Sequence, residues 1–377
     1  MNPLPRRDFL KTAGTAAAAL ALPGSAVRAA PQSAPANPLP RWRGFNLQLL
    51  YRSGRDPVAP NEDHFRWLAD WGFDFVRLPL SYRAWLKKKS RPDELITAEE
   101  ARDVDESVLA VIDQAVEYGQ RHGIHVCICF HHAPGYRVGK NVREPFILWR
   151  DQDAVDAFTF HWDMFARRYR AVAKDRLSFN LFNEAPWPND DFNGAIYLRA
   201  VTPAVAAIRR HTPDRLIIAD GMGAGNLWAP ELIPLRVHQS VHCYIPGILS
   251  HYRVDWMKDR TEWPEPRWPG ATDDHGYAWD RARLDAYYSA WSGLIDQGIG
   301  VHMGETGGSH RLPHAIYLAW LSDVLGVCRD LKIGWALWDF IGESKFGILD
   351  TERTDVAYED WHGHKLDRKM LELLQRS

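Results

Sequence analysis

The sequence predicts a single (β/α)8 barrel over residues 41–377. Short apolar runs, each long enough for one strand, recur eight times, and segments with helical periodicity separate most of them. Near-continuous apolar runs are typical of parallel strands buried on both faces, and strands that alternate with helices are typical of β/α folds. Eight such units with loop insertions fit a closed barrel.

The elements follow one another in a regular order, with no domain boundary inside the barrel region. The predicted strands are residues 42–47, 73–80, 125–130, 177–182, 216–219, 240–244, 298–303 and 333–338. The predicted helices are residues 64–71, 98–121, 153–169, 193–210, 281–296, 315–329 and 365–374, and the fifth connection carries only the weaker segment 228–235. A doubly wound open sheet is the alternative, but the glycine-rich turn at 221–225 lacks the third glycine of a dinucleotide-binding fingerprint.

Residues 1–30 have the features of a twin-arginine signal peptide. Arg6 and Arg7 precede Asp-Phe-Leu-Lys, the apolar run 12–22 is too short to span a bilayer, and small residues around Ala29 suit signal peptidase. The Pro/Ala/Ser-rich stretch 31–40 predicts a linker. We therefore expect export to the periplasm or the medium.

Composition excludes several classes of ligand. Lys and Arg total 46 against 48 Asp and Glu, a net charge of −2, so no basic surplus exists to bind a nucleic acid backbone. Neither a membrane partner nor a cofactor is expected, and we expect a monomer. His131 and His132 have no completing carboxylate or His-x-His set, so we expect no metal.

The four cysteines, Cys127, Cys129, Cys243 and Cys328, are predicted to be buried free thiols. Cys127 and Cys129 lie on one face of a strand and cannot bridge each other. The export route that the signal implies carries proteins that have folded in the reducing cytosol.

Polar residues stand at or near the ends of six of the predicted strands. They are Arg77, His131, His132, Asn183, Glu184, His242, Tyr244, Glu305, Trp338 and Asp339. One polar residue at a strand end is often structural, but the carboxyl ends of barrel strands form the active site in this fold. The conjunction predicts a catalytic site.

Glu184 and Glu305, at the ends of the fourth and seventh strands, would face each other across the barrel mouth. Two carboxyl groups about 5 Å apart are what a retaining glycosidase needs: one attacks the anomeric carbon and the other transfers protons. Arg77, a permanent cation, would keep a nearby carboxylate ionised.

These residues resemble the signature of glycoside hydrolase family 5, the cellulase-like family of clan A. The matching motifs, in order and spacing, are Val76-Arg77-Leu78-Pro79, Phe130-His131-His132-Ala133-Pro134-Gly135, Asn183-Glu184, His242-Cys243-Tyr244, Gly304-Glu305 and Trp338. The resemblance covers the chain from about Trp42 to Trp338 and implies a retaining O-glycosyl hydrolase acting on a β-linked glycan or oligosaccharide.

The resemblance also implies a role for each residue. Glu184 is similar to the family's acid/base, and Glu305 to its nucleophile. Asn183 is similar to the residue that binds the sugar 2-hydroxyl, Arg77 and Tyr244 to the pair that holds the nucleophile, His131 and His242 to the site histidines, and Trp338 to the platform under the sugar.

Two positions depart from the family pattern. Ala185 stands where Pro usually follows the acid/base Glu, which changes the expected loop path. Cys129 stands where an Asp commonly precedes the third-strand histidine by two residues. Neither change removes a catalytic group, but both suggest an outlying subfamily.

Tryptophans in the long loops 133–149 and 245–279 are candidates for sugar stacking, because indole rings pack on the apolar faces of sugars. They are Trp149, Trp256, Trp263, Trp268 and Trp279. Trp187, three residues after Glu184, is the first choice for a further sugar contact. No binding module follows residue 377, so we expect soluble oligosaccharides or branched glycan fragments rather than crystalline cellulose as substrates.

Three alternatives stay open at this point. They are a non-catalytic glycan-binding barrel, an exo-acting glycosidase of the same family, and a metal-dependent barrel hydrolase. The last needs a ligand cluster such as His-x-His on the first strand, where Phe45-Asn46-Leu47 stands instead.

Overall fold

The computed structural model describes residues 35–51, 58–89, 94–138, 144, 146–257 and 263–377. The expected signal peptide lies outside the described residues. Residues 35–377 form one compact unit.

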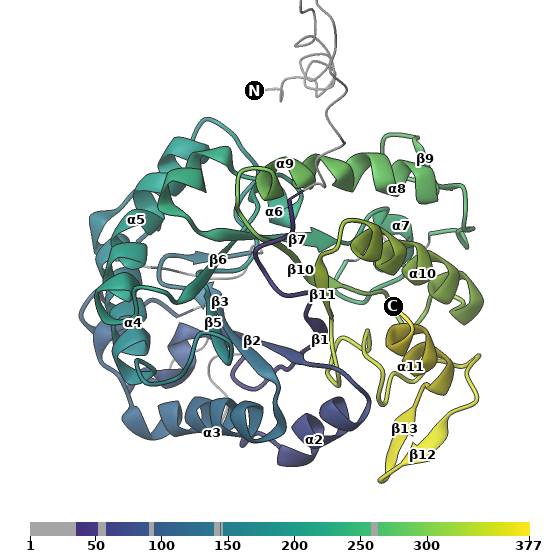
Figure 1. Cartoon of the computed structure of the whole chain (residues 1–377), viewed down its shortest axis with the longest axis horizontal. Coiled ribbons are helices and arrows are strands. Elements are labelled where there is room, and N and C mark those ends of the chain that lie inside the picture. The colour runs from purple at the N-terminus through teal and green to yellow at the C-terminus, as the bar shows by residue number, and fades with distance from the viewer. Residues whose placement is uncertain (1–34, 52–57, 90–93, 139–143, 145, 258–262) are drawn as a thin grey trace, which may run out of the picture. The chain divides into compact units, whose positions relative to one another are not determined.

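Eight parallel strands close into a barrel (Figure 1). They are β1 (Arg43–Asn46), β2 (Phe75–Ser81), β3 (His125–Ala133), β5 (Leu177–Asn180), β6 (Leu216–Asp220), β7 (His238–Cys243), β10 (Val301–Thr306) and β11 (Gly334–Leu337). Their order is β2-β1-β11-β10-β7-β6-β5-β3, and β2 also pairs with β3, which closes the sheet. The predicted barrel is confirmed, and the open sheet is excluded.

Helices surround the barrel at the predicted places (Figure 1). They are α2 (Glu62–Asp70), α3 (Glu106–His122), α4 (Gln152–Arg168), α5 (Gly194–His211), α8 (Arg281–Tyr288), α9 (Ser292–Ile295), α10 (His314–Asp330) and α11 (Arg368–Gln375). The α3 helix begins later than the predicted residue 98, because Asp105 caps it by accepting a hydrogen bond from Ser107 N. Gly123, with φ of 73°, ends it in the left-handed conformation.

The fifth connection has no full helix, as its weak periodicity indicated. It contains α6 (Met222–Gly225) and a 3-10 helix, η3 (Pro230–Leu235). Proline lacks the amide hydrogen that an α-helix needs, and Pro230 and Pro234 both lie in this segment. The remaining short elements are η1 (Tyr82–Trp85), η2 (Glu100–Arg102), β4 (Tyr136–Arg137), α7 (Gly247–Ser250), β8 (Ala271–Thr272), β9 (Ala278–Trp279), η5 (Ser289–Trp291), β12 (Glu359–Trp361) and β13 (His364–Leu366).

The barrel core is apolar and reaches slightly beyond the predicted domain start. Leu39 is buried, and the Asn37 side chain exchanges two hydrogen bonds with the main chain of Val301. Ordered packing therefore begins before Arg41, inside the stretch expected to be a linker. The four cysteines are free and buried, as predicted.

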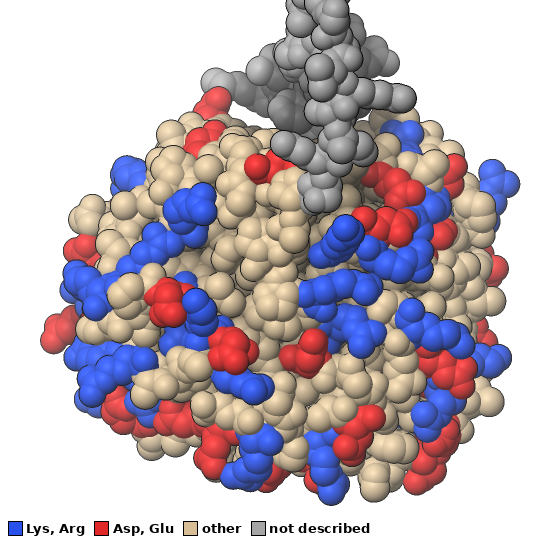
Figure 2. All heavy atoms as spheres, in the orientation of Figure 1, with Lys and Arg blue, Asp and Glu red and all other residues tan. Residues whose placement is uncertain are grey.

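The surface carries both signs of charge. Basic and acidic side chains are intermixed on the face shown in Figure 2, which agrees with the near-balanced composition. Within the described part of the chain, no helix is long and apolar enough to cross a lipid bilayer.

Candidate active site

Eight of the nine predicted site residues converge at the carboxyl ends of the barrel strands. Contacts link Arg77 to Glu305 and Asn183, Tyr244 to Glu305, His242 to Glu184, and His131 to Trp338. They come from different strands that are far apart in sequence, so only barrel closure brings them together. The ninth residue, Trp187, lies on the loop after β5 and is half exposed.

Glu305 is the more buried of the two carboxyl groups, and each of its oxygens accepts a hydrogen bond. Arg77 Nη1 lies 2.5 Å from Oε1, and Tyr244 OH lies 3.0 Å from Oε2. Burial raises the pKa of Glu305. The positive charges of His242 and Arg77 oppose that shift, but the net direction is upward. The two donors nevertheless hold the ionised form, because a carboxylate accepts both bonds and a protonated acid does not accept them equally well.

Tyr244 stays a neutral donor to Glu305. Its burial and the nearby negative charges of Glu305 and Glu184 raise the pKa of the phenol well above its ordinary value. The hydroxyl proton therefore remains available for the hydrogen bond.

A local irregularity of β10 presents Glu305 to the barrel mouth. The pairing register of β10 with β7 shifts between Met303 and Glu305. A side chain at Gly304 would collide with the Ser240 hydroxyl, so glycine permits the close approach of the two strands. Such a bulge redirects the residue that follows it.

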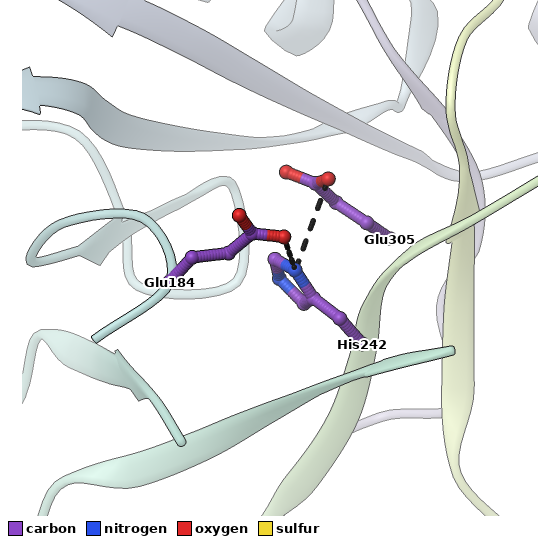
Figure 3. A group of neighbouring side chains, drawn as sticks. All are labelled: Glu184, His242 and Glu305. Atoms are coloured by element: carbon purple, nitrogen blue, oxygen red, sulfur yellow. Dashed lines mark hydrogen bonds and ion pairs between the residues drawn. The ribbon is translucent and has the colours of Figure 1, made fainter. Parts of the chain in front are cut away.

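Glu184 points at Glu305 and His242, as Figure 3 shows. Oxygens of the two carboxyl groups and a nitrogen of His242 lie within 4.8 Å of one another, and His242 Nδ1 lies 3.1 Å from Glu184 Oε1. This separation agrees with the roughly 5 Å of retaining glycosidases rather than the roughly 6.5–9.5 Å of inverting ones.

The main chain of Glu184 is held in an unusual conformation. Its φ is 52°, which is uncommon outside glycine. The Glu184 N–H donates to Asp220 Oδ2 at 2.9 Å, and the Tyr136 hydroxyl donates to the Glu184 carbonyl at 2.5 Å. The next turn is held by the Ala224 N–H, which donates to the Ala185 carbonyl, so Ala185 in place of the family's Pro leaves the carboxyl group in position.

Three buried polar atoms of the predicted site residues have no hydrogen-bond partner among the described residues, and one of them, His242 Nε2, lies 3.1 Å from Asp220 Oδ2 as an ion pair. Asn183 accepts from Arg77 Nη2 at 2.7 Å through Oδ1, which leaves its Nδ2 unpaired, and His131 Nδ1 is also unpaired. Burial together with Arg77 and Arg137 lowers the pKa of His131 well below its ordinary value, so the ring is neutral.

Trp338 forms one wall of the site. Its ring stacks on His131 with centroids 5.4 Å apart, and Tyr51 contacts both rings edge to face. Trp338 also packs with Val254 and Phe346. This cluster fixes the indole at the barrel mouth.

The loop tryptophans divide into two groups. Trp256 is 57% exposed and Trp187 is 46% exposed. Trp149 and Trp279 are buried, Trp263 is partly buried against the core, and the Trp268 indole donates to Asp323 on α10. Of the five candidates for sugar stacking, Trp149, Trp268 and Trp279 instead pack against the barrel and its helices, and Trp256 is the most exposed.

Sequence reasoning missed Asp220, Asn46 and Asn180. All three are buried and touch Arg77. Asp220 follows the apolar run 216–219 directly, which is the same signal that identified the other strand-end residues. The asparagines lie within predicted strands, where no sequence pattern distinguishes them.

Glu184, His242 and Glu305 bring three possible metal donors together. Arg77 and Tyr244 already donate to the two oxygens of Glu305, so these oxygens are less available as metal ligands. The donor set therefore fits proton transfer and nucleophilic attack better than metal binding.

Comparison with known proteins places these features in a family. Cellodextrinase A of Ruminococcus flavefaciens is 25% identical over 223 residues, which cover 57% of this chain and 60% of that protein. Endoglucanase C of Acetivibrio thermocellus is 25% identical over 198 residues, covering 51% and 52%. The chain thus spans about half to three fifths of the length of these curated relatives.

A solved structure described as a glycoside hydrolase is similar over nearly its whole length. It is 35% identical with a TM-score of 0.81, and the match covers 89% of this chain and 99% of the other. The model of the twin-arginine translocation signal sequence matches residues 3–23, which confirms the predicted export signal. The model described as "Cellulase (glycosyl hydrolase family 5)" matches residues 32–344. The chain therefore belongs to glycosyl hydrolase family 5.

Proposed function

We propose that this protein is a retaining hydrolase of β-linked glucan oligosaccharides. The observation that supports it best is the pair Glu184 and Glu305, whose oxygens lie within 4.8 Å of each other while Arg77 and Tyr244 donate to Glu305 and not to Glu184. One carboxylate is thus prepared for attack, and the other carries no fixed cationic side chain of that kind.

In the first step, Glu305 attacks the anomeric carbon, and the bond from that carbon to the leaving oxygen breaks. Glu184 gives its proton to that oxygen, so the leaving sugar departs as an alcohol. A covalent glycosyl ester on Glu305 results. In the second step Glu184, now a carboxylate, takes a proton from water, whose oxygen displaces Glu305 from the anomeric carbon.

The remaining site residues bind the reacting sugar. The unpaired Asn183 Nδ2 is a donor for the 2-hydroxyl, and the neutral His131 offers its unpaired Nδ1. The Trp338 indole supplies the apolar platform. Trp187 and Trp256, both exposed, extend the contact to further sugars of a longer chain.

The substrate class is supported by the relatives. A cellodextrinase and an endoglucanase are among the proteins that this chain resembles. Soluble β-glucan oligosaccharides fit an exported enzyme whose exposed tryptophans reach beyond one sugar. We further propose that the twin-arginine signal delivers the folded protein to the periplasm.

Both carboxyl groups should be essential. Glu305→Ala and Glu184→Ala should each lower kcat on a cello-oligosaccharide by at least about 10²-fold, because water cannot replace a positioned nucleophile or acid. Turnover is measured on variants whose circular dichroism matches the wild type. Near-wild-type turnover in either variant would remove that residue from its role.

The stereochemical outcome tests double displacement. Because two inversions at the anomeric carbon restore its configuration, the first product should keep the β configuration of the substrate. Proton NMR of the product, recorded before mutarotation, measures this. An α product would exclude the mechanism.

The exposed and packed tryptophans of one loop should differ in effect. Trp256→Ala should raise KM for longer cello-oligosaccharides about 3- to 10-fold, through lost stacking, and leave KM for an aryl monosaccharide nearly unchanged. Trp268→Ala is the matched control, since its indole is bonded to Asp323, and it should lower stability without any dependence on chain length. Equal KM changes on short and long substrates in Trp256→Ala would contradict this assignment.

Export should depend on the arginine pair. Arg6→Lys together with Arg7→Lys should leave the protein in the cytoplasm, because the translocation pathway reads this pair. Cell fractionation and immunoblotting of both forms measure the distribution. Unchanged appearance in the periplasm would refute the route.

A further inference from the structure

Asp220 is a fully buried acid that the proposed reaction does not use directly. It ends β6, its exposed fraction is 0%, and its carboxylate contacts protein groups on several sides. Oδ2 accepts from the Glu184 N–H at 2.9 Å and lies 3.1 Å from His242 Nε2 and 3.5 Å from Arg77 Nη2. Oδ1 accepts from Asn180 Nδ2 at 2.9 Å.

Asp220 and Glu184 lie on opposite sides of the His242 ring. Glu184 Oε1 is 3.1 Å from Nδ1, and Asp220 Oδ2 is 3.1 Å from Nε2. A neutral imidazole has one N–H and one bare nitrogen, so it could serve only one of two carboxylate oxygens. An imidazolium can donate its Nδ1–H to Glu184 and at the same time form the ion pair with Asp220 at Nε2, where the contact is an ion pair and not a hydrogen bond. The geometry therefore fits His242 in its charged form.

The charges around His242 favour the same form. Titratable and charged groups face His242 from several neighbouring elements: Arg77 on β2, His131 on β3, Glu184 after β5, Asp220 on β6, and His302 and Glu305 on β10. Tyr244 directly follows β7, the strand that carries His242, and the Tyr288 hydroxyl of α8 donates to the His242 carbonyl. Burial lowers the pKa of His242, but Glu305, Asp220 and Glu184 outweigh it and raise the value to about 10.

The groups around Asp220 keep it ionised. Burial alone would raise its pKa, but His242, Arg77 and the Glu184 N–H lower it below its ordinary value. Asp220 thus contributes a permanent negative charge behind the histidine.

Asp220 also acts on the main chain of Glu184. The N–H of that residue, with φ of 52°, donates to Asp220, while the Tyr136 hydroxyl holds its carbonyl. The left-handed conformation costs free energy, so it persists only where surrounding groups fix it.

We propose that Asp220 is a positioning residue that keeps His242 as an imidazolium and, through that ring and the Glu184 main chain, orients the acid/base carboxyl group. With the Nδ1–H of His242 donating to Oε1, the proton that Glu184 transfers is confined to Oε2. This inference rests on the proposed glycosidase function for its kinetic consequence, but the charge state of His242 is independent of that function.

The test compares Asp220→Asn with the wild type in 15N NMR of histidine-labelled protein. In the wild type, the His242 ring should stay doubly protonated between about pH 5 and pH 8, where an ordinary imidazole loses its proton. In Asp220→Asn, one of the three carboxyl groups beside the ring becomes a neutral amide, so the pKa of His242 should fall and the ring should titrate within that range. The His242 signals are assigned by their absence in His242→Gln.

Kinetics supply the second readout. Asp220→Asn should lower kcat/KM for a cello-oligosaccharide about 10- to 100-fold, because the leaving sugar of this substrate needs general acid catalysis. The decrease in kcat/KM should become larger at pH values where His242 has lost its proton. A 2,4-dinitrophenyl β-cellobioside has a leaving group that needs little protonation, so its kcat/KM should fall much less.

Asp339→Asn is the matched control. Asp339 is another fully buried acid at the barrel mouth, bonded to Gln48 and Ser344 rather than to His242 or Glu184. This substitution should leave the His242 titration unchanged and affect both substrates by the same factor.

The outcomes separate the two proposals. A neutral His242 at pH 7 in the wild type overturns the role of Asp220. An Asp220→Asn variant whose kcat/KM falls by the same factor on both substrates also overturns it. If Asp220→Asn does not fold, the wild-type titration alone still decides the charge state of His242. A wild type that hydrolyses neither substrate but holds a charged His242 refutes the proposed function and leaves the pairing with Asp220 intact.

Discussion

The buried guanidinium of Arg77 is the interaction on which the site depends. Taking a cation out of water is costly unless every face of it is paired, and here acceptors converge on it from most of the barrel. Its partners are Asn46 of β1, Cys129 of β3, Asn180 of β5, Asn183 after β5, Asp220 of β6 and Glu305 of β10. Because these groups belong to separate strands, one side chain couples closure of the barrel to the position of Glu305.

Arg77 and His242 share their acidic partners. Glu305 and Asp220 each lie within ion-pair distance of both side chains. The different roles proposed for the two glutamates rest on the contact of Arg77 with Glu305 and not with Glu184.

The two departures from the family pattern have local explanations. Cys129 places its sulfur 3.1 Å from Arg77 Nη2, where it is a weak, uncharged partner, while Asp220 lies on the same guanidinium nitrogen from β6. Ala185 leaves the strand-end loop held by the Ala224 N–H on its carbonyl. Both changes alter the surroundings of Arg77 and Glu184 and leave these side chains in place.

Apolar runs and helical periodicity were sufficient to predict the eight strands and most of the helices. A parallel strand that is buried on both faces needs apolar residues at nearly every position, so it can be recognised from the local sequence. Strand ends in that order also sufficed to predict the two glutamates and Arg77. Features that depend on which strands and loops become neighbours could not be predicted from the sequence. They are the contact of Asp220 with His242, the bulge before Glu305, and which loop tryptophans are packed or exposed.

The sequence gives the residue type at each position but not the residue that its side chain contacts in the folded protein. Trp256 and Trp268 have the same side chain in the same loop, yet one is exposed and the other donates to Asp323, because only the path of the folded loop decides which indole meets a helix. The sequence by itself determined the barrel and the kinds of groups at its mouth, since these follow from local periodicity. The tertiary structure decided which groups share protons, since that depends on distances between strands that are remote along the chain.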